Sequence, residues 1–254
     1  MKKFILFVLL PVSGLLQADD GIYAINQSCK DWGCFAGDAV GFPITISQPG
    51  SYRLTSNLVT TFVNTNVIEI TSSNVTIDLN GFAIIGPRTC TGYGLLTLPS
   101  TDPLSCTNAG MTSDGINGSN SVDSIVIKNG TVKGFDSGIA ILGGAQRGNM
   151  VINVIAEENE EGILIANGII KDSQANRNID RGFGSIATGN ENGGLIVKDS
   201  SAYGNFGWSA YAHVCSNVFF RDNGITNSNS GGDSQCTYYT NNSYCQVPTA
   251  NCVN

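Results

Sequence analysis

The chain has 254 residues, of which 13 are basic and 20 acidic, and its formal net charge is −7. Binding to nucleic acid needs a basic surface, so this charge argues against a nucleic-acid partner. Glycine contributes 31 residues and charged residues only 13 %. Asparagine and serine, which are poor helix formers, are also abundant. The composition therefore favours short strands joined by tight turns.

Residues 1–18 are typical of a secretory signal peptide. Two lysines precede a short apolar run that ends near a small residue, Ala18. An uncleaved membrane anchor is the alternative, but the run is short for a transmembrane helix and no second long apolar stretch follows. We predict a secreted or periplasmic protein with no membrane span after signal cleavage.

The eight cysteines predict disulfide bonds, as is usual in exported chains. Proximity along the sequence favours the pairs Cys29–Cys34 and Cys90–Cys106, and two further bonds among the last four cysteines. These four are Cys215, Cys236, Cys245 and Cys252. No C-x-x-C pair occurs, so we do not expect a zinc site.

Two motifs recur in the same order along the chain. The first is an apolar strand with a polar end, beginning at Val126, Val151, Ile169, Ile196 and Phe219. The second surrounds a glycine, at Gly115, Gly138, Gly162, Gly182 and Gly207, with intervals of 23, 24, 20 and 25 residues. A period of this size without helical segments indicates a solenoid of stacked strands. Asn80-Gly81 could be a hairpin turn, but in a solenoid it is a corner between two strands.

The stretches FPITISQPGSYRLTSNL at 42–58 and VIEITSSNVTIDLNGFAIIGP at 67–87 resemble the start of exported proteins of the pectin-lyase-like superfamily. The resemblance covers residues 42–229. It implies an all-β, right-handed parallel β-helix, here of about seven to nine coils. It implies no single activity, because the superfamily includes lyases, hydrolases, epimerases, adhesins and tailspikes. The N-T-D, G-H-G, R-I-K and D-P-H-D motifs of its enzymes are absent.

We predict four segments. These are the signal peptide 1–18, an N-terminal cap 19–50, a β-helix 51–229 and a C-terminal cap 230–254 that is rich in cysteine and tyrosine. A long insertion at 87–113 interrupts the coils, and such insertions often lie on the binding face. The C-terminal cap would cover strand edges that the last coil leaves unpaired.

Basic residues define the first candidate binding surface. Lys128, Lys171, Lys198 and Arg221 are predicted to occupy one column of the repeat, with Asn153 at the missing position. Stacked strands lie about 4.8 Å apart, so this column could bind the carboxylates of a uronate polymer. The alternative is a solvated ladder that is neutralised by the next column, which contains Asp172, Asp199 and Asp222.

Acidic residues define the second candidate site. Glu157, Glu158, Glu160 and Glu161 lie at one turn, and Asp180 follows one coil later. Paired carboxylates could perform acid–base chemistry on a glycosidic bond or hold calcium; a solvated bend is the alternative. Asp180 and Arg181 are the catalytic candidates, and a local ion pair is the competing interpretation. We predict no metal site and no cofactor, with calcium as the alternative.

Aromatic residues and one histidine complete the candidates. Tyr203 and Tyr211 could stack on sugar rings, or could belong to an internal stack. His213 lies among apolar residues, where a histidine is more often packed than catalytic.

From these features we predict a non-catalytic module that binds an extended polysaccharide or a cell-envelope component. The alternatives are a polysaccharide lyase or glycoside hydrolase, and a structural or adhesive rod that assembles with itself. The sequence does not indicate the oligomeric state.

Overall fold

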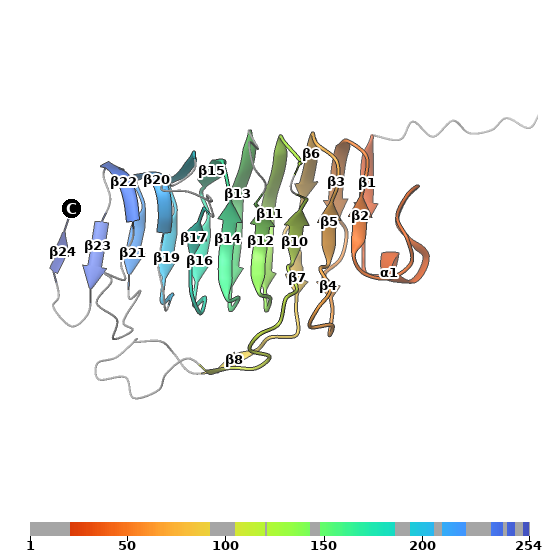
Figure 1. Cartoon of the computed structure of the whole chain (residues 1–254), viewed down its shortest axis with the longest axis horizontal. Helices are drawn as coiled ribbons and strands as arrows, with labels where there is room; N and C mark the ends of the chain where they lie inside the picture. The colour runs from red at the N-terminus through yellow and green to blue at the C-terminus, as the bar shows by residue number, and fades with distance from the viewer. Residues whose placement is uncertain are drawn as a thin grey trace, which may run out of the picture.

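The computed structural model describes residues 21–91, 105–119, 121–142, 148–185, 194–205, 210–221, 235–240, 243–246 and 251–253. At Tyr211, His213, Phe220, Arg221 and every residue from 235 on, it describes the backbone only. The predicted signal peptide lies outside the described residues. In the described part, short strands stack along one long axis (Figure 1).

The strands form three walls, here named A, B and C. Wall A stacks β2 (Ile44–Ile46), β5 (Ile68–Ile70), β10 (Ile116–Gly118), β12 (Ser137–Ile141), β14 (Glu161–Ile165), β17 (Phe183–Gly184) and the start of β20 (Ala210–Ser216). Wall B stacks β1 (Ile22–Ile25), β3 (Gly50–Leu54), β6 (Val75–Asp78), the first halves of β11 (Ile125–Lys133) and β13 (Asn149–Glu157), β15 (Gly168–Lys171), β18 (Leu195–Lys198), the end of β20 and β22 (Gln235–Thr240).

Wall C stacks β4 (Leu58–Val59), β7 (Ala83–Ile85), the second halves of β11 and β13, β16 (Gln174–Asn176), β19 (Ser201–Tyr203), β21 (Phe219–Arg221) and β23 (Ser243–Gln246). All pairings within the three walls are parallel. In the described part of the chain, antiparallel pairing is confined to β23 with β24 (Asn251–Val253) and to β8 (Cys90–Thr91) with β9 (Ser105–Cys106). The structure is thus all-β with long parallel sheets, as expected for a solenoid.

Asn80-Gly81 is a corner, as predicted. β6 pairs in parallel with β3 and β11 in wall B, while β7 pairs with β4 and β11 in wall C. Asn80 and Gly81 have φ angles of 53° and 80°, a left-handed conformation that asparagine and glycine tolerate better than other residues. This conformation turns the chain from one wall to the next.

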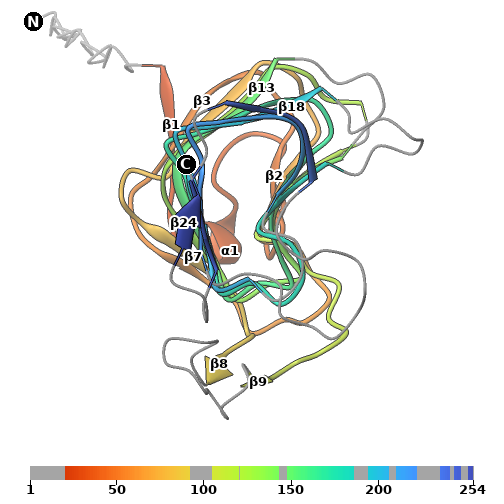
Figure 2. The same ribbon diagram turned by 90° about the vertical axis from the view of Figure 1, so that its left-hand side faces the viewer.

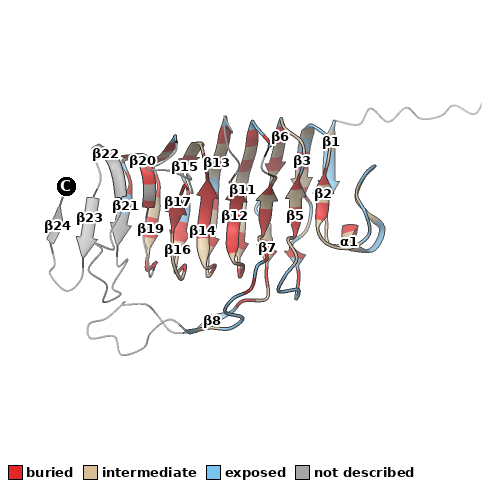
Figure 3. Ribbon diagram, viewed as in Figure 1, coloured by how far each residue is buried: buried red, intermediate tan, exposed pale blue. Residues whose placement is uncertain are grey.

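Apolar columns fill the space between the walls. Viewed along the axis, successive coils superimpose around this interior (Figure 2), and buried residues recur from coil to coil along the described strands (Figure 3). In wall B the inner column is Ile77, Ile127, Val151, Ile170 and Val197, all 0 % exposed. Each such side chain stabilises the fold by about 1.5–3 kcal/mol relative to an exposed one.

Three buried asparagines form a ladder inside the corner between walls C and A. The Nδ2 of Asn159 donates to the Oδ1 of Asn178 over 3.2 Å, and the Nδ2 of Asn178 donates to the Oδ1 of Asn205 over 2.8 Å. The same Oδ1 atoms accept the backbone N–H groups of Asn159 and Asn178. The ladder therefore satisfies polar groups that the corner buries.

The recurring glycines have a packing reason. A Cβ at Gly138 would lie 2.7 Å from the carbonyl oxygen of Gly162, and a Cβ at Gly162 would lie 2.4 Å from that of Gly182. Successive coils approach too closely here for any larger residue. The glycines therefore recur because each coil places the same backbone next to the previous one.

The disulfides Cys29–Cys34 and Cys90–Cys106 are present, as predicted. Cys215 is also disulfide-bonded. The first bond begins at α1 (Cys29–Trp32), and the second joins β8 to β9 at the root of the 87–113 insertion, hereafter the arm. β8 lies outside the stack of coils (Figures 1 and 2).

Among the described residues, no helix combines the length and hydrophobicity that a membrane span requires.

Candidate functional site

The predicted basic column is only partly correct. Lys171 and Lys198 are neighbours on wall B. On one side of this pair Ile152 separates it from Lys128, and on the other side the next coil has Ser216 at this position. The position between Lys128 and Lys171 is therefore occupied by Ile152, and not by Asn153 as predicted.

Arg221 lies in a different wall. It pairs with Tyr203 between β19 and β21 of wall C. The prediction that it extends the lysine column is wrong, because the coil after Lys198 returns to wall B sooner than the sequence motif suggested.

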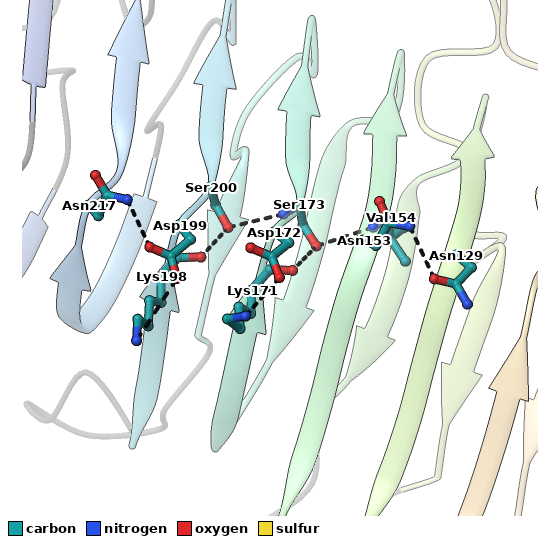
Figure 4. Close-up of polar contacts among 10 residues, drawn as sticks. All are labelled: Asn129, Asn153, Val154, Lys171, Asp172, Ser173, Lys198, Asp199, Ser200 and Asn217. Carbon is teal, nitrogen blue, oxygen red and sulfur yellow. Dashed lines mark hydrogen bonds and ion pairs between the residues drawn. The ribbon is translucent and has the colours of Figure 1, made fainter.

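Each lysine of the column has its own carboxylate. The Nζ of Lys171 lies 2.9 Å from Asp172, while the Nζ atoms of Lys198 and Lys128 each lie 3.9 Å from Asp199 and Asp78 respectively. Figure 4 shows the first two pairs at the corner between walls B and C. The hydrogen bond and charge of Asp172 raise the pKa of Lys171 above its usual value. The column is thus self-compensating, as the alternative interpretation held.

The same corner holds a polar ladder that stabilises the backbone (Figure 4). The backbone N–H of Val154 donates to the Oγ of Ser173, and the N–H of Ser173 donates to the Oγ of Ser200, both over 3.2 Å. Asp172 and Asp199 have φ angles of 50° and 49°. Short polar residues therefore recur here because the corner needs a left-handed backbone.

The four clustered glutamates are not a simple solvated bend. Each forms an ion pair with a basic side chain: Glu157 with Lys133 at 3.5 Å, Glu158 with Arg177 at 3.1 Å, Glu160 with Arg88 at 2.9 Å and Glu161 with Arg181 at 2.9 Å.

Two of these glutamates belong to a larger set, hereafter the acidic strip. Its members come from successive coils at wall A and at the corner that precedes it: Glu69, Asp114, Asp136, Glu160, Glu161 and Asp180. The backbone N–H of Glu161 donates to the carbonyl of Asp136, and that of Asp180 donates to the carbonyl of Glu160. Glu69 is opposite Asn117, whose Nδ2 donates to Asp114 over 2.6 Å. The strip therefore runs along the axis of the solenoid.

Three of the strip carboxylates, those of Asp114, Asp136 and Glu161, hold their protons more tightly than usual. Burial is the largest effect on Asp114 and raises its pKa; hydrogen bonds with Asn117 and Ser137 oppose it, and the charge of Glu69 adds a smaller rise. Burial and the charges of Asp114 and Glu160 raise the pKa of Asp136. Burial raises the pKa of Glu161 to about 6, against the opposing attraction of Arg181. These acids are close enough to repel one another.

Two arginines lie within the strip. Arg181 contacts both Glu161, at 2.9 Å, and Asp180, at 3.4 Å. Arg88 comes from the root of the arm, and its side chain is fully buried. One of its nitrogens, Nη2, contacts Glu160, whereas Nε and Nη1 have no hydrogen-bond partner among the described residues. The Oγ of Ser113, also buried, has none there either.

The structure thus joins the predicted residues Asp180, Arg181, Glu160 and Glu161, and adds four that sequence reasoning missed: Glu69, Arg88, Asp114 and Asp136. A signal was available for two of these. Asp114, Glu161 and Arg181 each lie directly before one of the recurring glycines. Asp136 and Glu160 each lie two positions before one. Arg88 and Glu69 do not lie before a recurring glycine, so the repeat does not indicate them.

Of the two tyrosine candidates, Tyr203 lies away from the strip. Tyr203 is half-buried on wall C, next to Asn176 of the preceding coil. Tyr211 and His213 lie on β20 with side chains outside the described part, and Asp222 lies wholly outside it. Within the described part, no three His, Cys, Asp or Glu residues are grouped as a metal ion would require.

Comparisons of this chain with protein-family models, with curated proteins and with solved structures find no match. The resemblance to the pectin-lyase-like superfamily therefore depends on the sequence motifs alone.

Proposed function

We propose that this is an exported protein that binds an extended polysaccharide, or another glycan of the cell envelope, without cleaving it. The observation that carries the proposal is the acidic strip, in which successive coils present carboxylates along one line. The root of the arm contributes Arg88 to the same line.

A glycan suits this surface for two reasons. Carboxylates accept hydrogen bonds from sugar hydroxyls, and Asn66 and Asn117, which contact Glu69 and Asp114, add amide groups beside them. An extended chain also needs a binding surface that repeats, and the stacked coils repeat about every 4.8 Å. The lysine column is a weaker candidate, because its charges are neutralised locally.

The proposal includes the finer features of the fold: a right-handed winding, about seven to nine coils, and disulfide-stapled caps at both ends. It also includes removal of residues 1–18 and a secreted or periplasmic location. The two intact disulfides are compatible with an oxidising compartment.

A glycan array combined with detection of reaction products tests this function. We expect binding to a polysaccharide class, with no new reducing ends and no unsaturated sugars. Failure of every glycan to bind would refute the proposal. If the size of the protein then rose with concentration in light scattering, the self-assembling rod would be favoured instead.

A glycoside hydrolase is the second candidate, because two strip carboxylates have contrasting environments. Burial raises the pKa of Glu161 to about 6, as a general acid requires. The side chain of Asp180 is half-exposed, and Arg181 contacts both groups. In this scheme Glu161 would protonate the glycosidic oxygen, and Asp180 would activate water or attack the sugar.

Release of reducing ends from a polysaccharide panel tests the hydrolase. The hydrolase predicts turnover that both Glu161→Gln and Asp180→Asn reduce at least about a hundredfold, the scale of general acid–base catalysis. Turnover that is absent, or that survives both substitutions, would reject these residues as catalysts. Glu157→Gln is the matched control, since Glu157 lies on wall C outside the strip.

A further inference from the structure

We propose that the ligand of the acidic strip is an extended glycan that carries free amino groups, rather than a uronate polymer. This inference rests on the proposed glycan binding and names the chemical class of the ligand.

The charge of the strip is the first argument. Its carboxylates are Glu69, Asp114, Asp136, Glu160, Glu161 and Asp180, whereas its cations are Arg88 and Arg181. Arg88 pairs with Glu160, and Arg181 is shared between Glu161 and Asp180. Glu69, Asp114 and Asp136 form no ion pair among the described residues. Ammonium groups would relieve the repulsion among these acids, whereas a uronate chain would increase it.

The arrangement of these acids is the second argument. Asp114, Asp136 and Glu160 come from three consecutive coils, and burial together with neighbouring acids raises the pKa of the first two. Stacked coils repeat about every 4.8 Å, which is of the same order as the interval between sugars in an extended glycan. Successive amino sugars could therefore meet successive carboxylates.

Arg88 supplies an independent third argument. Its guanidinium is fully buried and is directed at the strip by its contact with Glu160, and its Nε and Nη1 have no acceptor among the described residues. Buried donors of this kind call for an oxygen atom. A hydroxyl group of the bound sugar is the acceptor that the inference assigns to them. An amino sugar offers both the ammonium for the acids and the hydroxyl for Arg88.

Calorimetric titration of the mature protein with three six-sugar oligomers tests the inference. The oligomers are of glucosamine, N-acetylglucosamine and galacturonic acid, at slightly acidic pH and low salt. We expect the glucosamine oligomer to bind best, with an affinity that falls as salt is added, because exposed charges are screened.

Two double variants with the same change of charge separate the strip from the rest of the surface. Asp136→Asn with Glu161→Gln should weaken binding of the glucosamine oligomer at least about tenfold, which corresponds to about 1.4 kcal/mol. Asp172→Asn with Asp199→Asn, at the lysine corner, should leave it within about twofold. Thermal unfolding followed by circular dichroism verifies that both variants fold.

The other possible results contradict the amino-group inference, the role of the strip or the proposed function. Preferential binding of the acetylated or the galacturonate oligomer would refute the amino-group inference and leave glycan binding intact. Equal weakening by both double variants would show that net charge, and not the strip, attracts the ligand. If neither these oligomers nor the glycan array gave binding, the proposed function would fail with the inference.

Discussion

Glu161 shows how a single residue acquires unusual chemistry from its position. It pairs with Arg181, which alone would lower its pKa, yet burial and the charges of Asp180, Asp136 and Glu160 prevail and raise the pKa to about 6. Only the stacking of coils brings these residues together, since they are up to 45 positions apart in the sequence.

The raised pKa predicts how stability depends on pH. The folded protein binds the Glu161 proton more tightly than the unfolded chain, whose glutamates have an ordinary pKa of 4.5. The contribution of Glu161 to the free energy of unfolding should therefore rise by up to about 2 kcal/mol as the pH falls from about 8 to about 4, below the ordinary pKa of the unfolded glutamate. Asp114 and Asp136 act in the same direction, because their pKa values are also raised.

Urea unfolding of the wild type and of Glu161→Gln at the two pH values measures this contribution. The variant should lose the corresponding part of the gain in stability at low pH. Glu157→Gln, at a more exposed ion pair, should retain it. A pH dependence unchanged in Glu161→Gln would contradict the burial of this carboxyl group.

Sequence reasoning identified some site residues but not their grouping. Asp180, Arg181 and the glutamate run were recognised because they are consecutive or close in the chain. Asp114 and Asp136 were missed because their proximity becomes visible only when the coils are aligned on the recurring glycines, and Arg88 was missed because it comes from the arm. Long-range register is not encoded in local charge patterns.

At the scale of elements, the corners determine the shape more than the strands do. The asparagine ladder predicts a clear effect of Asn178→Ala. This change leaves the backbone N–H and the Nδ2 of Asn159 without the Oδ1 acceptor that both use. We expect a loss of about 2–4 kcal/mol in the free energy of unfolding.

Asn176→Ala is the matched control for the ladder. Its Nδ2 contacts Gln174 at the exposed surface over 3.3 Å, so the expected loss is below about 0.5 kcal/mol. Chemical denaturation of both variants would measure the difference. Equal losses would mean that the ladder adds nothing beyond an ordinary surface hydrogen bond.

The recurring glycines allow a second test of the coil packing. A Cβ at Gly162 would lie 2.4 Å from the carbonyl oxygen of Gly182, so Gly162→Ala should destabilise the protein by about 1–3 kcal/mol through overpacking. Gly110→Ala introduces only the strain of a positive φ, because no atom lies within 4 Å of its Cβ. The melting temperature should fall more for the first variant, and the reverse order would argue against close contact between the coils.

Sequence patterns predicted the elements better than their alignment. Asn80-Gly81 was correctly placed at a corner, and the glycine repeat correctly indicated stacked coils. The lysine column failed at Arg221 because coils differ in length: along wall B, Val126, Met150, Ile169, Ile196 and Val214 are in register. The last interval is 18 residues, which is shorter than a uniform repeat would require.

At the scale of the whole molecule, the solenoid turns a repeating sequence into a surface with two different charged corners. The corner between walls B and C pairs each lysine of its column with an aspartate, whereas in the strip before wall A Glu69, Asp114 and Asp136 form no ion pair among the described residues. The function proposed here depends on that difference, and so does the preference for amino groups over carboxylates in the ligand.

Nuclear magnetic resonance of the labelled protein during titration with the glucosamine oligomer tests this claim most directly. The account predicts that the backbone amides of Asp114, Asp136, Glu161 and Arg181 shift together at low ligand concentration, although they are widely separated in the sequence. Shifts centred on Lys128, Lys171 and Lys198, or confined to one continuous stretch of chain, would contradict both the strip and its role.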